Sequence, residues 1–434
     1  MFAVAVALTV GSVVAPAYPA AAAPTCFGKR ATIVGTNRDE SRPVELKGTP
    51  GNDVIVGLRG YDYIDARGGV DLICAGEGDD EIYAGPGNDK IRGEGDIDFV
   101  LGGGGHDSIW GGAGPADDLR GERGNDRLFG GPGSDDWLVG GPGDDVMNGG
   151  RGRDAVLFAD SPQGVHADLS TGEATGHGND RMVSVETVAG TYFDDVLYGD
   201  DNANFLAGGT GDDELHGLGG DDHLRSGDPA PAGNDLLDGG EGSDTANYYL
   251  SWEGVQADLS TGQAVSSGVD TLMGIENLFG SKENDVLTGN DENNVIQGFQ
   301  GDDVMDGRGG TDMAMFQNSF ELLIDLGEGT AVEDRGSDTL KNFEDIIGSS
   351  FADTIIGDDG RNSIWGGRGT DSLIGAGGDD VLIGERGNDS VNGAVGTDTC
   401  DAETEIDCEL DPAAAFYSRD RGELTRFRPG ERRN

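Results

Sequence analysis

Residues 48–92 read GTPGNDVIV, GLRGYDYID, ARGGVDLIC, AGEGDDEIY and AGPGNDKIR, and this pattern of about nine residues continues to residue 157. Two units in the run are one residue longer, and glycine holds the fourth place of every unit except one, where Asp96 stands. Glycine tolerates positive φ and lets two backbones approach closely. The run therefore predicts a chain that turns once in every unit.

Aspartate recurs at the sixth place of these units, at Asp53, Asp62, Asp71, Asp80, Asp89, Asp98, Asp107, Asp117, Asp126, Asp135, Asp145 and Asp154. The eighth place is apolar, as in Ile55, Ile64 and Ile73, and the tenth unit offers either Trp137 or Leu138 for it. Such residues favour short β-strands that stack into a narrow core. A unit alone buries little, so stability must come from its neighbours. The carboxylates and loop carbonyls are hard oxygen ligands, which predicts that the chain binds calcium.

The units GGPGDDVMN (140–148) and GGRGRDAVL (149–157) match Gly-Gly-x-Gly-x-Asp-x-apolar-x at every fixed place. The chain thereby resembles the RTX, or hemolysin-type, calcium-binding nonapeptide repeat family. This resemblance implies an all-β fold, a parallel β-roll in which successive units form strands on alternate sides. It also implies that calcium lies between loops two units apart, held by the Asp carboxylates and by loop carbonyls.

Three further runs of the same unit follow and extend the predicted metal ligands to Asp195, Asp213, Asp222, Asp235, Asp244, Asp285, Asp303, Asp312, Asp353, Asp371, Asp380, Asp389 and Asp398. The second unit of each run carries Asn204, Asn294 or Asn362 instead. Because asparagine offers only a neutral oxygen, we expect these sites to be weaker or empty.

Related spacers separate the runs: residues 165–190 and 255–280 align without a gap, and a looser third copy spans 323–348. Their alternating DLSTG arm predicts a β-hairpin that either covers an end of each run or contacts a partner. The predicted organisation is a signal peptide (1–23), an N-terminal cap (24–47), four β-roll blocks with three spacers between them, and a C-terminal cap with an Arg-rich tail (402–434). In order, block 1, spacer 1, block 2, spacer 2, block 3, spacer 3 and block 4 cover 48–157, 158–189, 190–247, 248–279, 280–315, 316–347 and 348–401.

The composition is strongly acidic, with 82 Asp and Glu against 29 Lys and Arg and a formal net charge of −53. Such a chain repels itself when compact, and its 79 glycines and 14 prolines bring it close to disordered compositions. Roughly 15–20 calcium ions in the loops would offset much of this charge. We therefore expect the metal-free chain to be largely unfolded and calcium to drive folding.

Residues 1–23 are apolar and end in small residues that fit Ala-x-Ala cleavage, which predicts a secretory signal peptide, although no Lys or Arg precedes the apolar stretch. No membrane span is predicted. The four cysteines agree with export. Pairing Cys26 with Cys74 and Cys400 with Cys408 would fasten both ends of a solenoid; free thiols and a zinc site are the alternatives, although no Cys-x-x-Cys pair is present.

The repeats and spacers occupy most of the chain, and neither a His-Glu-x-x-His nor a Gly-x-Ser-x-Gly motif occurs, so no enzyme is predicted. We expect a structural scaffold that binds calcium and is secreted to the outside of the cell. There it is either associated with the cell surface or released. The alternative is a calcium-stiffened adhesin, with Tyr248, Tyr249 and Trp252 as an exposed surface for a cell-surface or glycan partner. The negative charge disfavours nucleic acid as a partner.

Overall fold

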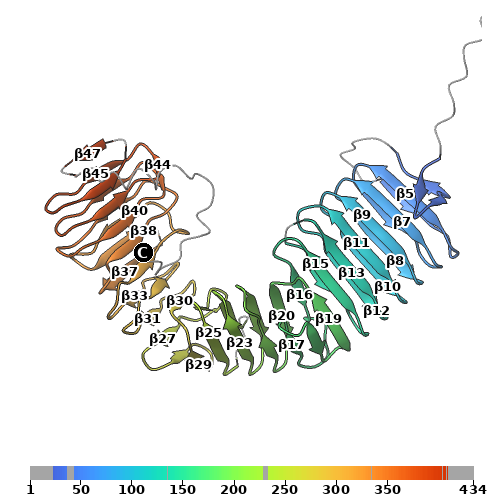
Figure 1. The fold of residues 1–434 in the computed structure, drawn as a ribbon, viewed down its shortest axis with the longest axis horizontal. Helices are drawn as coiled ribbons and strands as arrows, with labels where there is room; N and C mark the ends of the chain where they lie inside the picture. The colour runs from blue at the N-terminus through green and yellow to red at the C-terminus, as the bar shows by residue number, and fades with distance from the viewer. Residues whose placement is uncertain are drawn as a thin grey trace, which may run out of the picture.

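A computed structural model describes residues 23–36, 44–133, 135–227, 233–333, 335–402, 404–406 and 408. Within these residues the regular structure is entirely β, and nearly all strands belong to two long sheets that form a solenoid (Figure 1). The predicted all-β parallel β-roll is confirmed. The predicted signal peptide, apart from residue 23, and nearly all of the Arg-rich tail lie outside the described residues.

The first sheet, which we call the plain sheet, is parallel throughout. Its strands, in spatial order, are β4 (Val44–Lys47), β6 (Asp62–Asp65), β8 (Glu81–Pro86), β10 (Phe99–Gly104), β12 (Asp118–Arg123), β14 (Trp137–Val139), β16 (Ala155–Leu157), β20 (Thr187–Thr191), β22 (Phe205–Gly209), β24 (His223–Gly227), β26 (Thr245–Asn247), β30 (Asn277–Phe279), β32 (Val295–Gln297), β34 (Met313–Met315), β38 (Asp345–Ile347), β40 (Ser363–Trp365), β43 (Val381–Ile383) and β46 (Thr399–Asp401).

The second sheet, the hairpin sheet, also contains antiparallel strands. In spatial order it consists of β3 (Ile33–Val34), β5 (Val54–Arg59), β7 (Leu72–Glu77), β9 (Lys90–Gly95), β11 (Ser108–Ala113), β13 (Arg127–Gly131), β15 (Val146–Gly150), β19 (Asn179–Val183), β18 (Glu173–Thr175), β17 (His166–Asp168), β21 (Val196–Tyr198), β23 (Glu214–Gly219), β25 (Leu236–Glu241), β29 (Val269–Met273), β28 (Gln263–Val265), β27 (Gln256–Asp258), β31 (Val286–Thr288), β33 (Val304–Asp306), β37 (Gly336–Lys341), β36 (Thr330–Glu333), β35 (Leu323–Asp325), β39 (Thr354–Ile356), β42 (Ser372–Ile374), β45 (Ser390–Asn392) and β47 (Thr404–Ile406). Two short pairs lie outside these sheets: β1 (Thr25–Cys26) with β2 (Lys29–Arg30), and β41 (Arg368–Gly369) with β44 (Arg386–Gly387).

The core is a column of the apolar residues at the eighth place of each unit. Ile73 pairs with Ile91 and Ile91 with Ile109 in the hairpin sheet, and all three side chains are fully buried. One continuous cluster of buried residues extends from Leu46 to Cys400. Each unit contributes a single large side chain to the column, so a unit is stable only when other units stack on it.

The structure corrects the predicted phase of the tenth unit. Asp136, not Asp135, occupies the buried ligand place, and its N–H and carboxylate join the same hydrogen bonds as the aspartates of the neighbouring units. Asp135 lies in the turn with φ +66°. Leu138 is buried in the core column, whereas Trp137 is 54% exposed. The extra residue of this unit is therefore accommodated in the turn before Asp136.

The spacers do not interrupt the two sheets. In the first spacer β17, β18 and β19 form an antiparallel meander whose outer strands pair in parallel with β21 and β15. The second and third spacers repeat this arrangement with β27–β29 and β35–β37. The predicted β-hairpin is thus present in each spacer. All three meanders lie in the hairpin sheet, while the plain sheet continues past them.

Each spacer therefore adds two more strands to the hairpin sheet than to the plain sheet. Because neighbouring strands lie about 4.8 Å apart, the hairpin sheet is about 10 Å longer at each spacer. Across sheets packed roughly 10 Å apart, this difference corresponds to a bend of at most roughly one radian. The solenoid indeed follows an open arc, with β27 and β29 on its outer side and β30 on its inner side (Figure 1).

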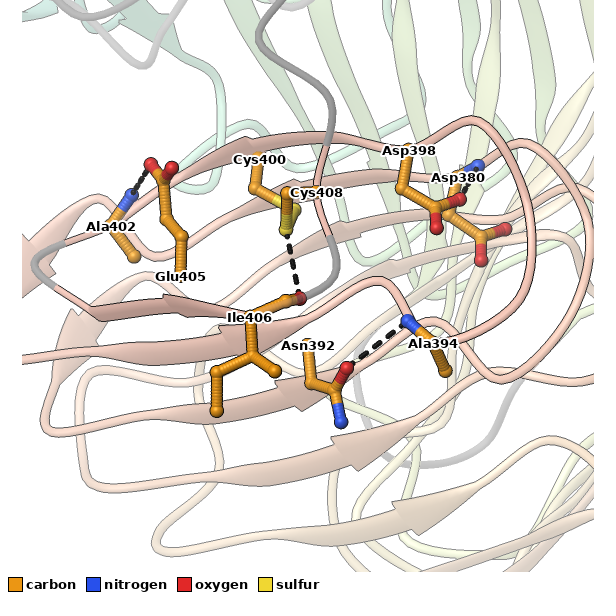
Figure 2. The surroundings of a disulfide bond; sticks show 9 residues. All are labelled: Asp380, Asn392, Ala394, Asp398, Cys400, Ala402, Glu405, Ile406 and Cys408. Atoms are coloured by element: carbon orange, nitrogen blue, oxygen red, sulfur yellow. Dashed lines mark hydrogen bonds between the residues drawn. A yellow bond between two sulfur atoms is a disulfide. The ribbon is translucent and has the colours of Figure 1, made fainter.

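Both predicted disulfides are present, Cys26–Cys74 at the N-terminal end and Cys400–Cys408 at the C-terminal end. Figure 2 shows the second, where Cys400 in β46 bonds to Cys408 just after β47. The predicted aromatic surface needs a correction. Tyr248 is buried because its side chain packs into the core cluster, whereas Tyr249 and Trp252 are exposed. Among the described residues no helix could span a membrane.

Candidate metal-binding turns

The turns between strands stack along the two edges of the solenoid and are joined by a ladder of aspartate side chains. The N–H of Asp71 donates to Oδ1 of Asp89 at 2.7 Å, and the N–H of Asp89 donates to Oδ1 of Asp107 at 2.7 Å. The same bond links the other edge, from Asp62 to Asp80 and from Asp80 to Asp98. Each carboxylate therefore lies between its own turn and the preceding turn on that edge.

The second carboxylate oxygen of most of these residues is buried and has no hydrogen-bond donor. This holds for Oδ2 of Asp71, Asp80, Asp89, Asp98, Asp107, Asp117, Asp126, Asp136, Asp145, Asp154, Asp213, Asp222, Asp244, Asp303, Asp371 and Asp380. A buried carboxylate oxygen without a partner is strongly unfavourable, and native proteins rarely leave one. A regular row of such oxygens is what a row of bound cations would satisfy, so these residues fit calcium.

The pKa values of these carboxyl groups show how unfavourable the uncompensated charge is. Burial raises the pKa of Asp98 to about 9, although the hydrogen bond from the Asp80 N–H opposes the rise and the charge of Asp80 adds to it. Burial likewise raises the pKa of Asp235 and of Asp303 to about 8. At neutral pH these groups can remain ionised in the folded state only beside positive charge.

Glycine at the fourth place brings successive turns into backbone contact. A Cβ atom on Gly105 would lie 1.3 Å from the carbonyl oxygen of Gly87, and one on Gly143 would lie 1.5 Å from that of Gly124. Within the described residues no three His, Cys, Asp or Glu side chains converge on one point. Because calcium takes six to eight oxygens, most of its ligands here must be carbonyls or water.

The side chains at the fifth place form a second, exposed ladder, which the sequence did not predict. Oδ1 of Asn88 accepts the N–H of His106 at 2.9 Å, and Nδ1 of His106 accepts the N–H of Asn125 at 2.8 Å. In this ladder the acceptor belongs to the earlier turn, whereas in the aspartate ladder it belongs to the later one. Where a turn carries both bonds, they run in opposite directions and tie it to its stacked neighbour at two places.

Apart from Asp135, every predicted ligand residue lies at a buried place in the aspartate ladder. The calcium contacts of the individual residues stay a prediction.

Sequence reasoning missed the acids by which the spacers continue the ladder. Asp180, Asp270 and Asp338 accept the N–H groups of Asp145, Asp235 and Asp303, and Glu186, Glu276 and Glu344 accept those of Asp154, Asp244 and Asp312. The signal was available, because an acid recurs at both places in all three spacer copies.

Comparison with known families decides what this geometry represents. The RTX calcium-binding nonapeptide repeat (four copies) matches residues 47–82, 83–115, 116–136, 133–156, 185–209, 198–228, 232–247, 279–314, 347–382, 366–400 and 374–407, which is more than half of the chain. The chain belongs to the RTX calcium-binding nonapeptide repeat family. RTX repeats bind calcium, so calcium is the ion that these turns take up. The three longest gaps between matches contain the three hairpins of the spacers. No curated protein matches this RTX chain.

Proposed function

We propose that this RTX protein is a secreted calcium-binding protein that folds when it binds many calcium ions and serves as a curved extracellular scaffold. The observation that carries the proposal is the row of buried Oδ2 atoms without donors, together with the raised pKa values of their carboxyl groups. A cation would turn these unfavourable groups into the principal contacts between turns. The repeat solenoid is a fold typical of binding and structural proteins, and we infer no catalytic role.

Charge supports the coupling of folding to calcium. Stacking the turns brings like-charged carboxylates together in a chain of net charge −53. Unfolding separates these charges and returns the carboxylates to water, so without calcium the unfolded state gains on both counts. Binding free energy is then folding free energy, as in other proteins whose metal sites exist only in the folded state.

Export is supported by the apolar residues 1–23 and by the two disulfides. Disulfides form and persist mainly in oxidising compartments. Extracellular calcium modules bind at about 10⁻⁴–10⁻³ M, so export would expose the chain to enough calcium to fold.

The proposal is tested by far-UV circular dichroism of the full chain during a calcium titration from metal-free buffer. We expect a weak, disordered signal to change into a β signal along a steep curve, because stacked turns fold cooperatively. Magnesium is the control ion: it is smaller and demands near-octahedral geometry, so it should not produce this change. A β signal of full size in metal-free buffer at neutral pH would contradict the proposal.

A second candidate is an interaction module in which calcium only stiffens the support. The observation in its favour is that large aromatic side chains are exposed just after the first spacer and within the second, where Tyr192 is 67% and Trp252 71% exposed. The double substitution Tyr192→Ala and Trp252→Ala should then abolish binding to cells or to a glycan array and leave calcium-induced folding unchanged. Unchanged binding would favour the scaffold.

A further inference from the structure

In four turns, hydrogen-bond donors of the chain itself satisfy the carboxylate of the ligand aspartate. In the turn of Asp195, the N–H of Thr191 donates to Oδ2 at 2.6 Å, and the Thr191 hydroxyl lies 3.1 Å from both carboxylate oxygens. In the turn of Asp285, the N–H of Ser281 donates to Oδ2 at 2.6 Å and its hydroxyl to Oδ1 at 2.8 Å.

The other two turns of this kind repeat the arrangement. Thr49 donates its N–H and its hydroxyl to Oδ2 of Asp53, at 2.6 and 2.9 Å. Ser349 donates its N–H to Oδ2 and its hydroxyl to Oδ1 of Asp353, at 2.7 and 2.9 Å. None of these four carboxylates contributes to the row of buried oxygens that lack a donor. A Ser or Thr at the second place thus supplies what a cation would supply elsewhere.

These four turns also share a position: each is the first repeat turn on its edge after a segment that is not a repeat. Oδ1 of Asp195 accepts the N–H of Val165, and that of Asp285 accepts the N–H of Val255, both of which lead into a spacer hairpin. Asp353 accepts from Leu322 in the same way. A calcium ion shared between stacked turns would therefore lack one of its two glycine-rich loops here.

On the opposite edge of the solenoid, the turns of Asn294 and Asn362 use a side-chain amide where other turns would use a cation. Nδ2 of Asn294 donates to the carbonyl oxygen of Glu276 at 2.8 Å, and Nδ2 of Asn362 donates to that of Glu344 at 3.2 Å. Both carbonyls belong to the spacer that precedes the turn. The amide thus links to a neighbouring carbonyl directly, whereas a carboxylate at this place would need a positive charge between the two oxygens.

We propose that the turns of Asp53, Asp195, Asp285, Asp353, Asn204, Asn294 and Asn362 hold no calcium. Hydroxyl donors close the four aspartate turns and amide donors close those of Asn294 and Asn362, while Asn204 presents a neutral oxygen that already accepts the N–H of Asp200. Calcium is then confined to the remaining aspartate turns, most of which have a buried carboxylate oxygen without a donor. Every spacer is consequently followed by a calcium-free joint, with one such turn on each edge. This inference rests on the proposed function and narrows the sites within it.

The test compares matched aspartates in consecutive turns of one edge, since the N–H of Asp285 donates to Oδ1 of Asp303 and Oδ2 of Asp303 has no donor. Native mass spectrometry of the full chain at saturating calcium counts the bound ions. Asp285→Asn should bind as many ions as the wild type, whereas Asp303→Asn should bind at least one fewer. An equal loss in both variants, or no loss in Asp303→Asn, would overturn the inference. A wild-type chain that binds no calcium would instead contradict the proposed function.

Two further variants keep the inference testable if Asp285→Asn does not fold. Ser281→Ala removes the hydroxyl, and Asn294→Ala removes the amide that donates to Glu276. We expect both to retain the wild-type number of calcium ions and to lower the thermal midpoint at saturating calcium. Loss of an ion in either variant, or an unchanged midpoint in both, would overturn the inference.

Discussion

At the scale of the residue, the two oxygens of one aspartate have different tasks. Oδ1 of Asp107 accepts the N–H of Asp89 and so aligns two turns, while Oδ2 is buried without a donor. The first contact is made by the chain alone, and the second is left for a cation. This division explains why the repeat requires aspartate, because an asparagine has only one oxygen to offer.

Acidification should partly replace calcium. Burial raises the folded-state pKa of these carboxyl groups above their ordinary value of 3.8, to about 7 for Asp107 and about 9 for Asp98. Folding stability of the metal-free chain is therefore fully present below the unfolded pKa and is lost as pH rises through the folded pKa values. We expect circular dichroism in metal-free buffer to show more β structure at about pH 5 than at pH 9.

The control is the same pH series at a fixed, subsaturating calcium concentration. There, protons compete with calcium for the carboxylates, so the calcium affinity should fall as the pH falls. A metal-free chain that loses β signal between pH 9 and pH 5 would show that the buried carboxylates do not oppose folding.

Close stacking of the turns should make one glycine indispensable and its neighbour replaceable. Gly105 has φ +148°, and a Cβ there would meet the Gly87 carbonyl oxygen; a Cβ on Gly104 would meet nothing within 4 Å. Gly105→Ala should cost about 2–5 kcal/mol through strained backbone and overpacking. Gly104→Ala should leave the thermal midpoint in calcium nearly unchanged. Equal midpoints for the two variants would contradict the stacking described here.

Much of the structure at the residue scale was predictable from the sequence, because the repeat keeps its phase. Asp at the sixth place and Ile at the eighth identify the ligand row and the core column wherever a unit has nine residues. Where the tenth unit has an extra residue, Asp135 and Asp136 are adjacent and composition alone does not distinguish them. The turn geometry decides, since one φ is positive and the other residue is buried. The ladder of N–H donors depends on register and was not predictable from one unit.

At the scale of the element, the first and last strands of the hairpin sheet each pair with one neighbour among the described residues. In the described part of the C-terminal turn, β47 pairs with β45, and Cys408 is linked to Cys400 in β46 (Figure 2). The N–H of Asp380 still donates to Oδ1 of Asp398 in the last repeat turn. The disulfide thus restrains an end that stacking alone supports weakly.

Removing this disulfide should loosen the end locally. In the double variant Cys400→Ser and Cys408→Ser, amide hydrogen exchange in calcium should accelerate in β45–β47. Exchange in β21–β25 should stay at the wild-type rate, because each turn contacts only its neighbours. The disulfide closes a short loop, so the stability change should be no more than about 3 kcal/mol. Uniformly faster exchange along the whole chain would contradict this local role.

Sequence alternation predicted a hairpin in each spacer, and the structure contains it. The sequence did not predict that all three hairpins enter the same sheet. That outcome depends on whether an even or odd number of strands separates successive spacers, and therefore on the complete strand count of each run. Hairpins β17–β18, β27–β28 and β35–β36 all lie between strands of the hairpin sheet. Their effects on the shape of the solenoid therefore add.

At the scale of the whole molecule, the bend can be removed by design. Asp145 and Asp180 are separated by 35 positions instead of the usual 18. Deleting residues 158–174 restores the regular spacing and joins Leu157 directly to a unit that ends in β19. Deleting 248–264 and 316–332 does the same for the other spacers. In calcium, the triple deletion should be longer than the wild type by small-angle X-ray scattering, despite its shorter sequence.

A matched control removes repeats without touching a spacer. Deleting residues 84–101 takes out two complete units, which form one strand in each sheet. This variant should keep the bend and shorten the rod slightly, because both sheets lose equal length. If the triple deletion folds in calcium and its maximum dimension does not exceed that of the wild type, the extra strands do not cause the arc.

The direction of the buried aspartate ladder makes the order in which this chain emerges matter. The buried N–H of a ligand aspartate is accepted by a carboxylate further along the chain, usually 18 or 19 residues away, as for Asp71 and Asp89. A chain that emerges N-terminus first thus cannot complete any turn until the next turn on that edge has followed it. The turn that has emerged last therefore lacks this bond until the next turn on its edge follows. For the aspartate ladder, folding from the trailing end toward the leading end would meet no such delay.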